Sequence, residues 1–165
     1  FNAVRSGKYP FPELEKETLP SLASLNGKAM ETALGFTVHA CTDITGFGIL
    51  GHLLEVSAGC DAQVVVDYDA LVFYPGAVDM YEKGETTGSN KANRALVQTR
   101  PLQMEKSLGK SQDEILYDPQ TSGGLLIAVP GAEADRLINA LHQNGVPAAV
   151  RIGEIINEPV GIRVV

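Results

Sequence analysis

Hydrophobic positions along the chain alternate between helical and strand-like spacing. From Ser21 the apolar residues recur every three or four positions, which predicts a helix that ends at Gly35. Residues 36–41 (FTVHAC) alternate apolar and semi-polar side chains, as is typical of a strand. A second helix is predicted over 49–58, where Ile and Leu side chains form one stripe, and the β-branched run in 62–68 (AQVVVDY) predicts a second strand.

The second half of the chain continues this alternation. Residues 123–130 (GGLLIAVP) predict a strand that ends at its proline. Apolar residues spaced i, i+3, i+4 and i+7 then predict a helix that ends before Asn144. Residues 148–156 and 160–165 are typical of two closing strands. Strands and helices mixed in this order predict an α/β sandwich with one mixed sheet and helices packed on it.

The length and the N-terminal segment predict one domain with a lead-in. Residues 1–19 are polar and rich in proline, so they are expected to be a linker, and the domain is expected to span 20–165. The chain has 165 residues, 44% of them hydrophobic and 20% charged, which is typical of a globular domain with a real core. Because the chain begins at Phe1 without a methionine, we expect it to be a piece of a larger protein.

Charge and cysteine content exclude several classes of protein. The net charge of -7 argues against a nucleic-acid binder, which is normally basic. Apolar runs in the sequence are shorter than the roughly 20 residues that span a bilayer, so a membrane partner is not expected. Cys41 and Cys60 form neither a disulfide framework nor a CxxC pair, which indicates a reducing, cytoplasmic compartment. Both thiols are expected to be buried as small apolar groups.

One segment departs from the acidic character of the chain. Residues 83–110 carry six Lys or Arg and only two acidic residues, a local excess of four positive charges. This pattern is compatible with a solvated face or with an electropositive segment that faces an anion such as phosphate. The residues alone leave both interpretations open.

A glycine-rich loop joins the first predicted strand to the second predicted helix. Residues 41–52 (CTDITGFGILGH) contain GxGxxG, and Asp67 follows the first glycine after roughly 20 residues, as in a dinucleotide-binding fingerprint. In that fingerprint the strand runs directly into the first glycine, whereas here three residues beginning with Asp43 intervene. The chain also lacks the regular βαβ succession of a dinucleotide domain, so this function is disfavoured.

Asp43 changes the chemistry that the loop can perform. A carboxylate beside a phosphate is repelled unless a cation lies between them. Mg²⁺ prefers oxygen ligands and is commonly held by one or two carboxylates together with phosphate oxygens. Asp43 is therefore either a ligand in a metal–phosphate turn or a cap that accepts backbone N–H bonds. Spacing alone does not decide between these two roles.

A second glycine motif precedes the strand predicted over 123–130. Residues 117–126 (YDPQTSGGLL) contain the turn starter Asp118-Pro119 and two adjacent glycines that permit close backbone approach. The segment is either a plain tight turn that leads into an edge strand or a surface that presses against a ligand or a partner domain.

Together, the two motifs carry a resemblance to a known family. Residues 40–55 (ACTDITGFGILGHLLE) and 118–130 (DPQTSGGLLIAVP) closely resemble the C-terminal domain of the selenophosphate synthetase (selenide, water dikinase) family, in the aminoimidazole ribonucleotide synthetase-like superfamily. The resemblance covers the chain from about residue 20 to its end. It implies an α/β (α+β) three-layer sandwich with a mixed sheet, dimeric in the intact enzyme, which makes selenophosphate from selenide and ATP with Mg²⁺ and releases AMP and phosphate.

The resemblance also implies the site residues. Asp43 matches the Mg²⁺-binding aspartate of this half of the family, and Thr45, Gly46 and Gly48 belong to the phosphate or nucleotide loop. Two further residues are candidate phosphate contacts: Asn93, which matches a family asparagine loosely, and Arg94. The reactive residues of the family lie in an N-terminal domain that is absent here. No catalytic residue is therefore expected in this chain, and the domain alone is expected to be inactive.

Two alternatives remain beside this interpretation. The chain resembles, less closely, other ATP-using members of the superfamily such as thiamine-phosphate kinases and hydrogenase-maturation proteins. A domain without the reactive half is also compatible with a non-catalytic module for dimerisation or regulation.

Overall fold

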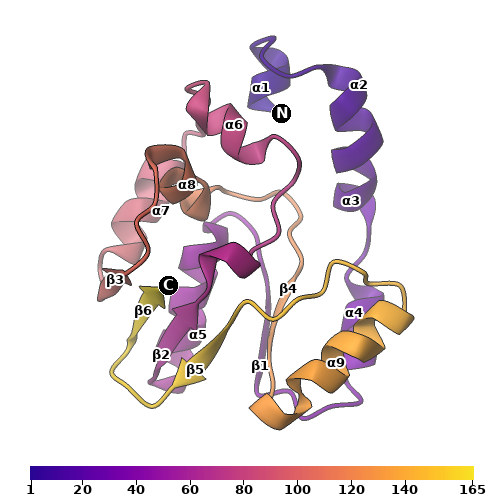
Figure 1. The fold of residues 1–165 in the computed structure, drawn as a ribbon, viewed down its shortest axis with the longest axis vertical. Helices are drawn as coiled ribbons and strands as arrows, with labels where there is room; N and C mark the ends of the chain where they lie inside the picture. Colours follow the sequence, from indigo (N-terminus) through magenta and orange to yellow (C-terminus); the bar gives the residue numbers. More distant parts are fainter.

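The computed structural model describes residues 1–16 and 18–165 and contains helices packed around two β-sheets (Figure 1). The predicted α/β class is confirmed. The prediction of one mixed sheet was wrong, because the strands are divided between a four-stranded and a two-stranded sheet. The sequence pattern shows which faces of a strand are apolar, but it does not show which strands are hydrogen-bonded to each other.

The four-stranded sheet has the order β3-β6-β2-β5 and is mixed. Its strands are β2 (Gln63–Val66), β3 (Leu102–Met104), β5 (Gly153–Ile156) and β6 (Gly161–Val164). Strand β6 runs parallel to both β2 and β3, whereas β5 runs antiparallel to β2. Alternate residues of β2 and β6 point into the main core, where Ile162 and Val164 are fully buried.

Helix α5 (Gly48–Cys60) covers this sheet and begins at the glycine loop. Its leucine stripe is buried as predicted, with Leu50 at 0% and Leu53 at 3% exposure. Ser57, which is also fully buried, accepts a hydrogen bond from the backbone N–H of Gly161 at 2.9 Å. This bond ties the end of the helix to the start of β6, so the helix that leaves the loop is fixed to the sheet.

The two-stranded sheet pairs β1 (Ala40–Asp43) with β4 (Leu125–Ala128) in antiparallel fashion. Helices α4 (Gly27–Ala33) and α9 (Gly131–Gln143) pack together beside it, as Figure 1 shows. The strand predicted from Phe36 begins only at Ala40, and the register places Asp43 opposite Leu125. The two motifs recognised in the sequence are therefore neighbours along one hydrogen-bonded ladder.

The N-terminal residues are helical where a lead-in was predicted. They form α1 (Asn2–Arg5), α2 (Phe11–Glu13), the π-helical segment η1 (Leu14–Thr18) and α3 (Leu19–Ala23). The helix predicted from Ser21 to Gly35 is interrupted, because Ser24 is extended with ψ 131°. Ser24 and Asn26 lie at this break, and both residue types favour caps and turns over helix interiors.

The middle of the chain forms short elements above the main core. They are η2 (Tyr68–Ala70), α6 (Ala77–Glu82), α7 (Asn90–Val97), α8 (Lys110–Glu114) and η3 (Ile115–Tyr117). Within the basic segment 83–110, Arg94 pairs with Asp113 and Glu114, and Lys106 pairs with Asp69. Part of its positive charge is thus neutralised within the domain. In the part of the chain that the structure describes, helices long and apolar enough to cross a bilayer are absent.

Candidate functional site

Asp43 is the last residue of β1 and is exposed at the entrance of the glycine loop. Its carboxylate accepts no hydrogen bond from any residue that the structure describes. A capping aspartate would accept backbone N–H bonds of the following turn, so this geometry does not provide the contacts that the capping role needs. Groups of three or more His, Cys, Asp or Glu able to hold a metal are absent among the described residues.

The backbone after Asp43 is held by the segment 117–124. The N–H of Ile44 donates to the carbonyl of Gly124 at 3.0 Å, and the N–H of Gly123 donates back to the carbonyl of Ile44 at 3.0 Å. One residue further, the N–H of Gln120 donates to the carbonyl of Thr45 at 3.0 Å. The second glycine motif therefore presses against the first motif of the same domain.

Two glycines make this close approach possible. A Cβ atom at Gly123 would lie 2.4 Å from the carbonyl oxygen of Ile44. Gly48 has a φ of +72°, and a Cβ atom there would lie 2.9 Å from the carbonyl carbon of Tyr117. A side chain at either position would push the two segments apart, since both contacts are with backbone atoms.

His52, on the first turns of α5, holds the loop from the helix side. Its side chain is 4% exposed, and its Nε2 accepts the N–H of Thr45 at 2.9 Å. Its Nδ1 lies 3.0 Å from a carboxylate oxygen of Glu55. Because Nε2 is the acceptor, the neutral ring carries its proton on Nδ1 and donates it to Glu55. The imidazole is thereby fixed as a support for the loop.

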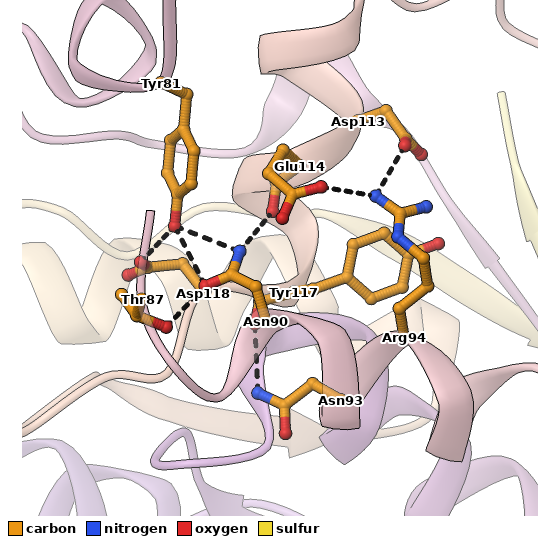
Figure 2. Close-up of polar contacts among 9 residues, drawn as sticks. All are labelled: Tyr81, Thr87, Asn90, Asn93, Arg94, Asp113, Glu114, Tyr117 and Asp118. Atoms are coloured by element: carbon orange, nitrogen blue, oxygen red, sulfur yellow. Dashed lines mark hydrogen bonds and ion pairs between the residues drawn. The ribbon is translucent and has the colours of Figure 1, made fainter. Parts of the chain in front are cut away.

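Asn93, on α7, joins the loop to the segment that follows η3. Its side-chain amide donates to the carbonyl of Gly46 at 2.8 Å and to the carbonyl of Tyr117 at 3.0 Å. The residue is 5% exposed. From the sequence, Asn93 is expected to contact phosphate, but its amide donors are committed to these two backbone oxygens. Figure 2 shows it directed at the chain near Tyr117.

Between Asp43 and Gly48, these contacts leave two backbone donors without a partner among the described residues. Among the described residues, the N–H groups of Gly46 and Phe47 have no hydrogen-bond acceptor. The N–H of Thr45 is bound by His52, and the N–H of Gly48 donates to the carbonyl of Thr45 at 3.1 Å. Of the predicted loop residues, Gly46 thus has an available N–H, and Phe47 is a further donor that the residue pattern does not indicate.

A polar network lies beside this cradle (Figure 2). The Tyr81 hydroxyl donates a short hydrogen bond to Asp118, and the Asn90 side-chain amide donates to the carbonyl of Glu114 at 3.0 Å. Burial raises the pKa of Asp118, although the bond from Tyr81 lowers it in part. Burial and the bond to Asp118 also raise the pKa of Tyr81. The bond from Tyr81 anchors Asp118 at the start of the segment 117–124, whereas Asn90 holds the end of α8 at Glu114.

Arg94 is the other candidate phosphate contact, and it belongs to an ion-pair cluster. One of its guanidinium nitrogens, Nη2, lies 2.8 Å from a carboxylate oxygen of Asp113 and 2.7 Å from one of Glu114. The guanidinium carbon lies 4.0 Å from the centroid of the Tyr117 ring. As Figure 2 shows, the side chain extends across that ring toward the two carboxylates.

The cysteines differ from their sequence-based expectation, since both Cys41 and Cys60 are exposed free thiols. Cys41 occupies an outward position of β1, and Cys60 is the last residue of α5. Sequence reasoning also missed the supporting roles of His52 and Gln120. His52 is part of the glycine motif, but a pattern of residue types does not show from which backbone N–H its imidazole accepts a hydrogen bond.

The comparisons with known proteins agree with the resemblance seen in the sequence. The family model described as AIR synthase related protein, C-terminal domain, matches residues 10–165. The chain is 38% identical over 149 residues to a selenide, water dikinase of Pelobacter propionicus, covering 89% of this chain and 42% of that protein. It is 37% identical over 155 residues to a selenide, water dikinase of Agathobacter rectalis, covering 94% of this chain and 44% of that protein.

The chain therefore spans a little over two fifths of the length of these relatives. Among solved structures, the Escherichia coli hydrogenase maturation protein HypE superposes with a TM-score of 0.62 at 19% identity. That superposition covers 92% of this chain and 40% of the HypE chain. At this identity the likeness shows a shared fold.

Proposed function

This chain belongs to the family of AIR synthase related proteins, as their C-terminal domain, and we propose that it is the C-terminal part of a selenide, water dikinase. The longer enzyme would use ATP and Mg²⁺ to convert selenide into selenophosphate with release of AMP and phosphate. Support comes from relatives of that name that are 37–38% identical over most of this chain. The domain alone would lack turnover, because we place no catalytic residue in it.

The observation that carries the proposal is the geometry of the glycine loop. It presents the carboxylate of Asp43 and, three and four residues later, the N–H groups of Gly46 and Phe47, none of which has a partner among the described residues. The carboxylate suits a cation, and backbone N–H groups at the start of a helix suit the phosphate oxygens that such a cation accompanies. One short loop thus offers groups for both parts of a metal–nucleotide substrate.

The donor set fits Mg²⁺ only if other ligands complete the site. Mg²⁺ is commonly held by one or two carboxylates together with phosphate oxygens and water. Asp43 would supply one carboxylate from this chain, and ATP and the N-terminal part of the longer protein would supply the others. When bound, Mg²⁺ would neutralise phosphate charge. The residues of this chain would bind and orient the metal–nucleotide substrate, and His52 and the segment 117–124 hold the loop in place.

The remaining parts of the proposal concern the partners. The protein would act with its own N-terminal domain, as a homodimer, on ATP and selenide in the cytoplasm. Thr45 and Gly48 would serve the loop through internal hydrogen bonds, since both of their N–H groups are occupied. A hydrogenase-maturation activity is less supported, because the HypE likeness rests on 19% identity. The alternative is a non-catalytic module for dimerisation or regulation. Selenide-dependent activity of the full-length protein would exclude it, and absence of that activity would favour it.

An activity assay tests the proposal in the full-length protein. Asp43→Asn should abolish selenide-dependent formation of AMP and phosphate from ATP, because the metal-binding charge is removed while size is kept. Asp61→Asn is the matched control: Asp61 has a φ of +51°, a left-handed conformation that asparagine also tolerates. Activity that is lost equally in both variants, or that is kept in Asp43→Asn, contradicts the proposed role. Absence of selenide-dependent activity in the wild type favours the non-catalytic module.

A further inference from the structure

We propose that Asn93 is a positioning residue, which aims the N–H of Phe47 at the bound phosphate by holding the carbonyl of Gly46. The inference rests on the proposed function and assigns a role to a residue far from the loop in sequence. Asn93 lies 47 residues beyond Gly46 and reaches it from α7. It would touch neither ATP nor metal with its amide donors, because both bonds of that amide go to backbone carbonyls.

The geometry of the peptide group connects Asn93 to Phe47. The carbonyl of Gly46 and the N–H of Phe47 belong to one planar peptide, which is trans. In a trans peptide the C=O and N–H bonds point in opposite directions, so fixing one fixes the other. The bond of 2.8 Å from Asn93 to the Gly46 oxygen therefore orients the Phe47 N–H away from Asn93. That N–H has no acceptor among the described residues.

The neighbouring peptide is held in the same way. The carbonyl of Thr45 accepts the N–H of Gln120 at 3.0 Å, and the N–H of Gly46 belongs to the same peptide. Both unpaired N–H groups of the loop thus lie in peptides whose carbonyls are held by residues outside it. The Thr45 carbonyl also accepts the loop's own Gly48 N–H at 3.1 Å, so among the described residues it is the Gly46 carbonyl that is held only from outside the loop.

Such support is needed because the loop is rich in glycine. Gly46 and Gly48 flank Phe47, and glycine permits backbone rotations that other residues resist. Without the bond from Asn93, the Gly46–Phe47 peptide can rotate and turn its N–H away from the phosphate. Asn93 is 5% exposed and also bound to the carbonyl of Tyr117, so its amide has little freedom to follow such a rotation.

Asn90 offers a matched control one helical turn away. It is on the same helix, is 1% exposed, and donates to the backbone carbonyl of Glu114 at 3.0 Å. Among the described residues its hydrogen-bond partners are Tyr81, Thr87 and Glu114, none of which lies in the glycine loop. Asn90→Ala and Asn93→Ala therefore both remove a buried amide that donates to the backbone, to one carbonyl from Asn90 and to two from Asn93. They differ in whether the Phe47 N–H loses its orientation.

The test measures Mg·ATP affinity and thermal stability of the full-length protein for wild type, Asn93→Ala, Asn90→Ala and Asp43→Asn. Asn93→Ala should weaken Mg·ATP binding by about tenfold to a hundredfold, the loss of one hydrogen bond to a charged group. Asn90→Ala should lower the Tm about as much as Asn93→Ala does, but it should change the Mg·ATP affinity less than about threefold. Equal effects of the two variants on affinity overturn the role of Asn93.

Asp43→Asn separates failure of this inference from failure of the proposed function. If Asp43→Asn abolishes metal-dependent binding while Asn93→Ala behaves as Asn90→Ala does, only the positioning role is lost. If Asp43→Asn binds Mg·ATP as the wild type does, the proposed site is wrong and this inference falls with it.

A measurement on the wild type keeps the test valid if Asn93→Ala does not fold. Mg²⁺ with inorganic pyrophosphate is titrated into ¹⁵N-labelled full-length protein, and backbone amide resonances are followed. The Gly46 and Phe47 resonances should shift more than that of Thr45, whose N–H is already bound to His52. A Phe47 amide that does not respond, or that shifts less than Thr45, overturns the proposal.

Discussion

Replacing Gly123 by alanine tests the contact between the two glycine motifs. The added Cβ atom would lie 2.4 Å from the carbonyl oxygen of Ile44 and 2.9 Å from its Cβ atom. Ordinary contact begins near 3.4 Å, so the two segments must separate by about 1 Å. The carbonyl that moves is the one that accepts the Gly123 N–H, and the residue that carries it follows Asp43 directly.

The expected cost follows from this overlap. Inserting atoms into a packed contact typically destabilises a protein by about 1–3 kcal/mol. With a urea dependence of about 2 kcal/mol per molar, a loss of about 2 kcal/mol lowers the midpoint of unfolding by about 1 M. Because the displaced backbone carries Asp43, Mg·ATP affinity should fall together with stability.

The neighbouring glycine is the control. A Cβ atom at Gly124 would meet no atom within 4 Å among the described residues, and its φ is not positive. Gly124→Ala should therefore keep or slightly raise the urea midpoint, since alanine restricts the unfolded chain. Urea unfolding followed by circular dichroism compares the variants. Equal midpoints for Gly123→Ala and Gly124→Ala would show that the two segments are not in close contact.

Three further predictions concern stability. Ser57→Ala removes a buried hydroxyl bound to Gly161, so it should lower the unfolding free energy by about 2 kcal/mol and the Tm by about 4–8 °C. Ser107 is exposed, so Ser107→Ala should leave the Tm unchanged when both variants are compared by calorimetry. Burial raises the pKa of Asp118 above its ordinary 3.8, so the folded state keeps this proton to higher pH than the unfolded state does. The free energy of unfolding of the wild type should therefore decrease as pH rises through the window above 3.8. Asp118→Asn should remove this pH dependence in urea unfolding at stepped pH, and an unchanged pH slope in the variant would contradict the prediction. Arg94→Leu should lower the unfolding free energy by about 1–2 kcal/mol, because Asp113 and Glu114 lose their shared cation and Tyr117 loses the guanidinium stacked on its ring. A urea midpoint equal to that of the wild type would refute this.

Regular elements with strong periodicity could be predicted from the sequence. Helix α5 and strand β2 were expected from an aliphatic stripe and a β-branched run, and the structure has both. The interruption at Ser24 was missed because periodicity continues across it, although only α4 packs in the core beside α9 and Leu25 at the break is 87% exposed. The elements between β2 and β4 gave no clear periodic signal, since even the longest of them, α7, has only eight residues.

The candidate site was predictable in part. Asp43 and the glycine loop were found because unusual residue types are adjacent in sequence. The sequence left open whether the two glycines before β4 form a plain tight turn or press against a ligand or partner domain, and the contact of Gly123 with Ile44, 79 residues away, could not be named. Likewise, the bonds of Asn93 to Gly46 and Tyr117 depend on how α7 packs, which no local pattern specifies.

The most direct test of the central claim is the Mg²⁺ dependence of ATP binding to the full-length protein, measured by calorimetry for the wild type and Asp43→Asn. If the loop is a metal–phosphate turn, the wild type binds ATP more tightly with Mg²⁺ than with a chelator, and Asp43→Asn loses this difference while its Tm stays unchanged. If Asp43→Asn keeps the full Mg²⁺ dependence, the carboxylate of Asp43 does not hold the metal, and the account of this site is wrong.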